Sequence, residues 1–255
     1  MDNVKKLARL AAIAACMVSA QSYASGDSAE MEAAQIDPGN IASLQRGARN
    51  FINYCAGCHS ARYVRFNTIG KYLELSEEQL VDNLMFNAEK TFETIQASMP
   101  RADAERWYGT APPDMSLMAR AKGADYIYNF LKGFHVVSSS PTGVDNIALP
   151  GTSMPHVLWE LQGYQQAVFS EHTETLEDGS TVSTNEFEHF EQLTPGKMSA
   201  DDYDEFVRDT VNFLAYIAEP VRAERRQLGV WVLMFLVVFL VIAAMLKKQI
   251  WKDVN

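Results

Sequence analysis

Cysteine is scarce in this chain, and positive charge is scarce relative to negative charge. Only three cysteines occur among 255 residues, so a disulfide framework is not expected. Two of them form one close pair, and without a second pair the roughly four ligands of a structural zinc site are missing. Lys and Arg number 22 against 32 Asp and Glu, and a net charge of −10 argues against nucleic acid as a partner. The sequence also contains no internal repeat and no low-complexity segment, which excludes a repeat architecture.

The close cysteine pair lies in the pentapeptide Cys55-Ala56-Gly57-Cys58-His59. Two thiols at this spacing can each add across a vinyl group of haem, and the histidine that follows them then binds the iron. A thioredoxin-like dithiol would follow a strand of a βαβ unit, and nothing strand-like precedes this motif. The motif therefore predicts one haem c, held covalently by Cys55 and Cys58, with His59 as the first axial ligand of the iron.

The N-terminus has the layout of a secretory signal peptide. Lys5, Lys6 and Arg9 precede a short apolar run, and small residues follow it as far as Ala24. We expect residues 1–24 to be this signal, cleaved after Ala24. An uncleaved anchor is an alternative, but the apolar run is too short to span a bilayer. Lipidation at Cys16 is a second alternative, because the residues before it loosely resemble a lipobox.

A longer apolar run lies near the C-terminus. Residues 228–246 carry no charge, and at about 1.5 Å per residue they span close to 30 Å, enough for one transmembrane helix. Lys247, Lys248 and Lys252 follow, which places this end in the cytoplasm by the positive-inside rule. We therefore expect an extracytoplasmic haem domain over residues 25–220, and an anchor with a short cytoplasmic tail over residues 221–255.

The soluble part is expected to be mainly helical, with long irregular loops. Start signals, apolar spacing and turn residues predict the following elements: helices opening at Asp37-Pro38, at the capping box 76–79, over 124–132 and from Ser199, and a hairpin joining 173–177 to 180–184 across Asp178-Gly179. The first helix would deliver its C-terminal end to the haem cysteines.

One histidine leaves the other face of the iron open. Met99 and Met154 are each followed by proline in a polar loop, and a thioether there is a soft, neutral ligand that favours Fe(II). Of the two, the turn-rich surroundings of Met154 suit a flat ring better. His135 or His156 would instead give a bis-histidine haem, and a vacant position would imply ligand or peroxide chemistry.

Several segments in order resemble the cytochrome c1 family, the haem subunit of the cytochrome bc1 complex. The resemblance rests on these segments: Leu44-Gln45-Arg46-Gly47 leading into the haem motif, Ala111-Pro112-Pro113-Asp114-Met115-Ser116-Leu117, Ala119-Arg120, Gly123-Ala124-Asp125-Tyr126-Ile127-Tyr128, and Val211-Asn212-Phe213-Leu214-Ala215-Tyr216 with Ala218-Glu219-Pro220 and Arg225-Arg226. The matches run from about residue 40 to the end of the chain. The resemblance implies a class I-like c-type cytochrome domain with long loop insertions, followed by one C-terminal transmembrane helix.

Carried over residue by residue, the resemblance implies His59 as the proximal ligand and Met154 as the distal ligand. Around Met154 the chain reads Gly-Thr-Ser-Met-Pro-His, where the family usually has more alanine and proline, so Met99 stays open as an alternative.

The resemblance also implies residues around the edge of the ring. Arg120 would hold a haem propionate with Tyr126 near it, since a guanidinium can bind a carboxylate through two hydrogen bonds. Pro112 and Pro113 would form a stiff wall against the haem.

The function implied by the resemblance is single-electron transfer without bond chemistry. Electrons would come from the Rieske iron–sulfur protein and pass to a soluble or tethered cytochrome c, in a dimeric complex that also contains cytochrome b. The bacterial style of the signal peptide places the chain in a bacterial inner membrane, with the haem domain on the periplasmic side. Two alternatives are the haem subunit of another respiratory oxidase or reductase, and a haem enzyme or sensor with an open iron site.

Residues 166–210 hold most of the negative charge. Twelve acidic and two basic side chains fall in this acidic segment. It is either a solvated loop face or a field that steers a basic electron carrier towards the haem edge.

Overall fold

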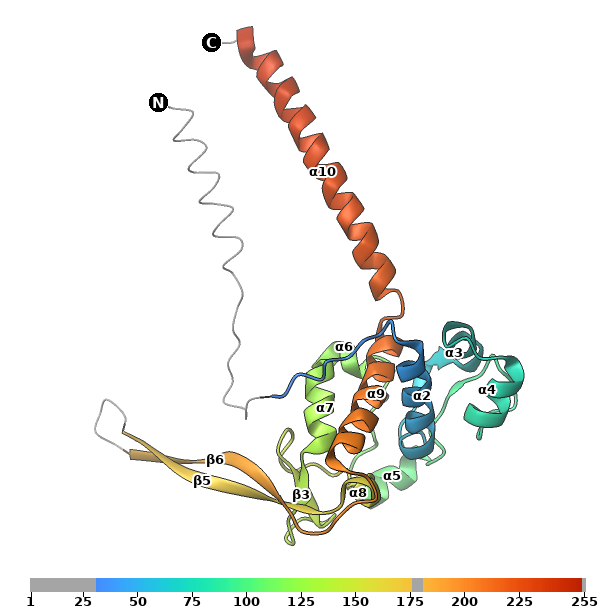
Figure 1. Cartoon of the computed structure of the whole chain (residues 1–255), viewed down its shortest axis with the longest axis vertical. Helices are drawn as coiled ribbons and strands as arrows, with labels where there is room; N and C mark the ends of the chain where they lie inside the picture. The colour runs from blue at the N-terminus through green and yellow to red at the C-terminus, as the bar shows by residue number, and fades with distance from the viewer. Residues whose placement is uncertain (1–30, 176–180, 254–255) are drawn as a thin grey trace. The chain divides into compact units, whose positions relative to one another are not determined.

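The computed structural model describes residues 31–175 and 181–253, and the predicted mainly helical domain is confirmed. The helices are α2 (Ile41–Tyr54), α3 (Phe66–Tyr72), α4 (Glu77–Leu84), α5 (Arg101–Tyr108), α6 (Met118–Lys122), α7 (Ala124–Lys132), α8 (Trp159–Gln162), α9 (Ala200–Ala218) and α10 (Arg222–Ile250), followed by a 3₁₀ turn at Trp251–Asp253. The strands are β1 (Ala61–Arg65), β2 (Thr94–Ile95), β3 (Phe134–Val136), β4 (Val144–Asn146), β5 (Gln165–Thr175) and β6 (Thr181–Gln192). Figure 1 shows α2, α7 and α9 side by side in the haem domain.

The first predicted helix, α2, begins later than expected. Asn40, not Asp37, is its N-cap, and the Asn40 side chain accepts a hydrogen bond of 3.1 Å from the Ser43 amide. Asp37 instead closes a turn ahead of the helix, since its side chain accepts from the Gly39 amide at 2.9 Å and its carbonyl from the Asn40 amide at 3.0 Å. An aspartate side chain can cap a helix or close an Asx-turn. The Asp37 carboxylate closes the turn, so Asn40 caps the helix instead.

Helix α2 packs tightly against α9. A Cβ at Gly47 would overlap the Asp209 carbonyl and lie 2.7 Å from the Phe213 Cβ, so the approach of the two helices depends on this glycine. The rings of Phe51 and Phe213 lie 5.9 Å apart, and the buried Asn50 amide donates to Thr210 across the interface at 3.2 Å. This contact fixes the C-terminal end of α2, where the haem motif begins.

The other helix signals in the sequence hold in the structure. The capping box predicted at 76–79 is present at the start of α4, with the Ser76 hydroxyl and the Gln79 side chain each accepting from the other's backbone amide. Helix α7 covers residues 124–132 as predicted, and α9 starts with Ser199 as its cap. Each of these caps joins residues a few positions apart, so the local sequence is enough to predict it.

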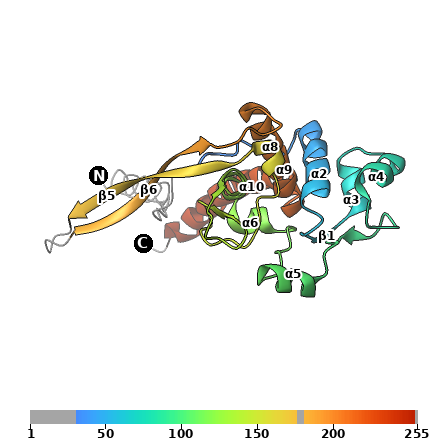
Figure 2. The same cartoon turned by 90° about the horizontal axis from the view of Figure 1, so that it is seen from below.

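The predicted hairpin is confirmed, but it is longer than expected. β5 and β6 pair antiparallel from Gln165↔Gln192 to Thr175↔Thr181, with an irregularity between Val168 and Phe169. The turn predicted at Asp178-Gly179 lies outside the described residues. Figure 1, and Figure 2 from below, both show the β5–β6 hairpin extending beyond the helices. Two short antiparallel pairs, β1–β2 and β3–β4, complete the described strands.

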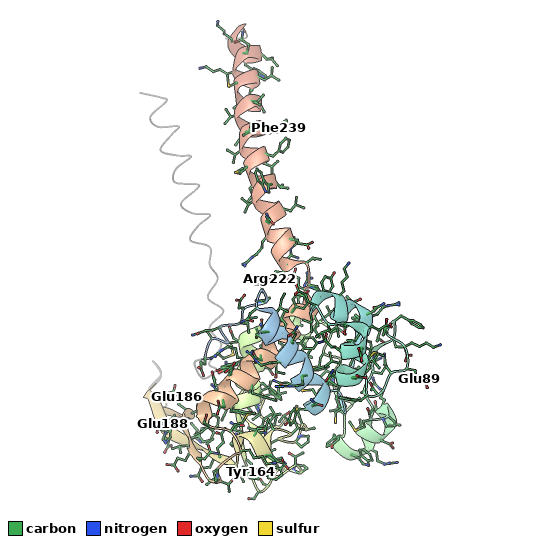
Figure 3. All side chains as sticks on the ribbon, turned by 45° about the vertical axis from the view of Figure 1, so that its right-hand side comes forward. Glu89, Tyr164, Glu186, Glu188, Arg222 and Phe239 are labelled. Atoms are coloured by element: carbon green, nitrogen blue, oxygen red, sulfur yellow. The ribbon has the colours of Figure 1, made fainter. Side chains whose placement is uncertain are left out.

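Helix α10 has the length and composition of a membrane anchor. The candidate span covers Glu224–Ile250, 27 residues, with a mean hydropathy of 2.9 and none of its most apolar window buried by the rest of the chain. Phe239, labelled in Figure 3, is one of many exposed apolar side chains along it. The predicted signal peptide at residues 1–24, and Cys16 within it, lie outside the described residues.

Candidate functional site

The haem motif continues directly from α2. The Cys55 amide donates to the Phe51 carbonyl at 2.9 Å, and the Cys58 and His59 amides turn back onto the Cys55 carbonyl at 3.0 and 2.8 Å. Cys55 and Cys58 are not joined to each other by a disulfide. The tight turn therefore sets the two sulfurs and the imidazole on one short loop at the end of a well-packed helix.

The two thiols lack the features of a redox dithiol. Burial raises the pKa of the Cys55 thiol to about 12, and burial also raises the pKa of Cys58. Redox-active cysteines in Cys-x-x-Cys motifs usually have a lowered pKa, because the thiolate is the reacting form. The environment thus disfavours the dithiol alternative.

His59 has one ring nitrogen engaged and one left for a metal. Its Nδ1 lies 2.8 Å from the carbonyl oxygen of Pro113, so the Nδ1–H donates to that carbonyl in the neutral ring. Burial lowers the pKa of His59, which keeps the ring neutral at pH 7. A backbone carbonyl on the second nitrogen orients a ligating histidine and raises its basicity. This donor set fits an axial ligand of haem iron acting through Nε2.

Asp114 holds the Pro-Pro loop beneath the histidine. Its carboxylate accepts from the Ser60 hydroxyl at 2.8 Å and from the Arg62 and Ser116 amides at 2.9 Å each. Burial alone would raise the pKa of Asp114, but these hydrogen bonds leave it below its ordinary value. Loss of that carboxylate would free the loop that carries the Pro113 carbonyl.

Sequence reasoning assigned roles to Pro112 and Pro113 but missed that of Asp114. The structure places Pro113 as the partner of His59, with Pro112 half-buried beside it. The signal was present, because Asp114 follows the two prolines directly and its side chain is short enough to bind nearby amides. Its partners Ser60 and Arg62, however, are 54 and 52 residues away in the sequence.

Met154 lies on a separate loop between β4 and α8. The residue is half-buried, and its amide lies 3.4 Å from the Thr152 hydroxyl. Gly151 has a positive φ of 76° and donates to Asp145 at 2.7 Å, which fixes the start of the loop. Val157, three residues on, packs against the same buried core as Cys55. The pairing of Met154 with His59 across a haem stays a prediction.

Met99 is tied to the haem motif through its backbone. The Met99 amide donates to the Gly57 carbonyl at 2.9 Å, and the Ser98 amide lies 3.4 Å from the Ala56 carbonyl. The segment that carries Met99 is therefore held against the loop that carries His59.

The remaining histidine candidates are engaged in aromatic contacts. His156 is buried and stacks on Phe134, with ring centroids 5.0 Å apart and planes 11° apart, and burial lowers its pKa to about 4. His135 lies 6.4 Å from both Phe169 and Phe190 at the base of the hairpin. Both rings have a structural role in packing.

Arg120 and Tyr126 lie close together in the sequence but in different environments. Arg120, on α6, is exposed, and within residues 31–175 and 181–253 it makes no ion pair. Tyr126, on α7, stacks on Phe130 at 6.3 Å and lies 5.6 Å from the Lys122 ammonium, and burial raises the pKa of its hydroxyl. The exposed guanidinium of Arg120 is compatible with the predicted propionate contact, which stays a prediction.

Comparison with known proteins identifies the family of the chain. A family model described as the cytochrome C1 family matches residues 34–254. The chain is 41% identical over 232 residues to a cytochrome c1 of Allochromatium vinosum, which covers 91% of this chain and 93% of that protein. It is 37% identical over 233 residues to a protein of Nitrosomonas europaea named ammonia monooxygenase gamma subunit, covering 91% and 92%. A cytochrome c1 of Rhodospirillum rubrum is 29% identical over 251 residues, covering 83% and 82%.

Proposed function

Because the chain belongs to the cytochrome c1 family, we propose that it takes electrons from a Rieske iron–sulfur protein and passes them to a basic cytochrome c. Membership of the family gives the general function directly. The chain is a membrane-anchored electron-transfer subunit of a bc1 complex, alongside cytochrome b, with one covalently bound haem c. The chain is then not an enzyme on its own. The direction of electron flow and the two protein partners are the proposal.

The observation that carries the proposal is the joint arrangement of Cys55, Cys58 and His59. Two thiols on one turn and an imidazole whose Nδ1 is fixed by the Pro113 carbonyl suit thioether attachment and axial ligation together. Haem c supplies the one-electron Fe(II)/Fe(III) couple. The chain's own residues hold the ring, exclude water and set the potential.

We propose Met154 as the distal ligand. A distal ligand approaches the iron from the face opposite His59, whereas Met99 is hydrogen-bonded to the loop on the histidine side. Met154 comes from an independent loop, so it is free of that restriction. Arg120 and Tyr126 are proposed to bind the haem propionates, and Pro112 and Pro113 to line the ring.

The chain layout supports a periplasmic haem domain. We propose that residues 1–24 are a removed signal, 25–220 the haem domain and 221–255 the anchor and tail of a protein in a bacterial inner membrane. Support comes from the basic end of the first segment and from Lys247 and Lys248 at the far end of α10. A dimeric assembly of the complex follows from the family resemblance alone.

The hairpin offers a surface for a basic electron acceptor. Glu171, Glu186, Glu188 and Glu191 are exposed on β5 and β6, and Figure 3 labels Glu186 and Glu188 there. The negative electrostatic field of these carboxylates would speed the encounter with a basic carrier. Salt screens this attraction, which suits a partner that must leave quickly. We therefore propose the steering interpretation of the acidic segment, which the exposure of these side chains supports.

The salt dependence of electron transfer tests this proposal. Oxidation of the reduced complex by a basic cytochrome c, followed in a stopped-flow spectrometer, is expected to slow roughly tenfold or more from low to high salt. Glu186→Gln with Glu188→Gln should slow the reaction at low salt and flatten its salt dependence.

The matched control removes the same charge elsewhere. Glu77→Gln with Glu78→Gln changes two exposed acids in the first turn of α4 and should leave the rate near that of the wild type. A rate that ignores salt, or equal slowing in both pairs of variants, would contradict docking on the hairpin.

A second candidate function is electron transfer within an oxygenase. The relative named ammonia monooxygenase gamma subunit shares 37% identity across most of both chains, so a role as the electron-entry subunit of another oxidase or reductase has support. Quinol-driven reduction alongside a b-type haem separates the two functions, because only the bc1 complex requires both.

A further inference from the structure

Three arginines stand where α10 leaves the haem domain. Arg222, Arg225 and Arg226 all lie in its first two turns, and Figure 3 labels Arg222 at this junction. In the proposed topology this is the outer side of the membrane, whereas the positive-inside rule concentrates Lys and Arg on the cytoplasmic side. An exported N-terminal domain sets the orientation of the anchor regardless of these charges. Three cationic side chains at the membrane surface nevertheless favour an anionic partner at this level.

One of the three arginines is neutralised within the chain. Arg225 forms an ion pair with Glu219, whose side chain is only 15% exposed. Glu219 precedes Pro220 at the end of α9, so this pair joins the last residues of α9 to the first turns of α10. Arg225 is therefore a junction residue and has its counter-charge.

Arg222 and Arg226 are left on one face of the helix. They are four residues apart, which places their side chains next to each other. Both are exposed, and neither makes an ion pair within the part of the chain that the structure describes. Their charges add at the same place on the surface.

The acid nearest to them in sequence points elsewhere. Glu224 is two residues from each arginine, about 160° away around an α-helix. It acts instead on Tyr216: burial raises the pKa of that hydroxyl to about 12, with contributions from Tyr72 and Glu224. Among the residues that the structure describes, no ion pair joins Glu224 to Arg222 or Arg226, in keeping with their separation around the helix.

The depth of the two arginines matches the lipid headgroups. The uncharged run begins at Leu228, so at 1.5 Å per residue Arg226 lies about 3 Å and Arg222 about 9 Å outside it along the helix. The headgroup region is about 5–8 Å thick on each side of the hydrocarbon core. Long arginine side chains can adjust by a few ångströms, so both guanidinium groups reach this layer.

We propose that Arg222 and Arg226 together bind the phosphate of an anionic phospholipid headgroup at the outer end of α10. A guanidinium binds phosphate through two parallel hydrogen bonds, and two of them converging on one site exceed the charge of a single phosphate diester. That excess favours anionic lipids over zwitterionic ones, whose ammonium group opposes the arginines. The site does not depend on which proteins exchange electrons with the haem.

The test uses the full haem-loaded chain in nanodiscs of phosphatidylcholine, with or without phosphatidylglycerol. Mass spectrometry of the intact protein after gentle release counts the lipids it retains. Arg222→Gln with Arg226→Gln should weaken retention of phosphatidylglycerol about thirtyfold, with phosphatidylcholine unaffected. Arg222→Lys with Arg226→Lys keeps the charge and should recover part of the affinity.

The control removes two arginines from the haem domain instead. Arg101→Gln with Arg106→Gln changes two exposed residues of α5 and should retain phosphatidylglycerol as the wild type does. An unchanged haem spectrum shows that each variant is folded.

Any one of four outcomes would overturn the lipid site. The double glutamine variant retaining phosphatidylglycerol normally would do so, as would an equal loss in the control. Inorganic phosphate that binds and displaces the lipid would assign the site to free phosphate. Normal lipid retention combined with loss of cytochrome b from the purified complex would assign the arginines to a protein contact.

Discussion

Replacing both Cys55 and Cys58 by serine is expected to leave the chain with no covalently held haem. Thioether bonds survive denaturation, whereas axial ligation by His59 does not, because it needs the folded site. Haem-dependent peroxidase staining of a denaturing gel should therefore show a band for the wild type and none for the double variant. Replacing either cysteine alone leaves one thioether, so a weaker band with a shifted absorption spectrum is expected.

Cys16 supplies the matched control for this experiment. Cys16→Ser makes the same chemical change in the predicted signal peptide, and it should leave the haem band intact. A band that persists in the double variant would mean that the haem is attached elsewhere or that the motif has another role. Loss of the band in Cys16→Ser would show that the staining reports export or folding and not attachment.

Met154→Leu is expected to lower the reduction potential sharply and to let carbon monoxide bind the ferrous haem. Leucine has nearly the volume of methionine, so packing of the loop changes little, but the sulfur ligand is lost. A thioether favours Fe(II), and its removal should lower the potential by on the order of a hundred millivolts or more. Redox titration and carbon monoxide difference spectra measure the two effects.

Met99→Leu is the comparison that decides the ligand. It makes the same substitution in the other Met-Pro loop, and with Met154 intact the potential should stay near that of the wild type. If Met154→Leu left the potential and carbon monoxide binding unchanged while Met99→Leu altered them, the distal ligand would be Met99. If neither variant had an effect, a histidine ligand or an open iron site would be the remaining explanation.

The sequence predicted those parts of the fold that are specified locally. Helices α4, α7 and α9 start or end where caps and apolar spacing indicate, and β5 and β6 pair in the two segments whose alternation predicted a hairpin. Asp37 shows the limit of this reasoning, since the same side chain suits a helix cap or a turn, and Asn40 competes with it nearby. Helices α5 and α6 have eight and five residues, too short to show a clear periodicity.

In the candidate site, too, the residues that are adjacent in the sequence were predicted, whereas the contacts between distant residues were not. Cys55, Cys58 and His59 are contiguous, so the motif predicts them without a fold. The bond from His59 to Pro113 and the anchoring role of Asp114 join residues more than fifty positions apart. Such contacts depend on tertiary packing, and a single sequence holds no direct signal for them. The resemblance to the family supplied Pro112 and Pro113, but not the atoms by which they act.

The most direct test of the account is quinol-driven reduction of this chain in its native complex. The chain would be isolated from native membranes in mild detergent and given a quinol, with absorption spectra recorded over time. We expect the c-type haem to become reduced in a preparation that also contains b-type haem, and a quinol-site inhibitor to block the reduction. A c-type spectrum without b haem, reduced only when a carrier protein is added, would contradict the assignment to a bc1 complex.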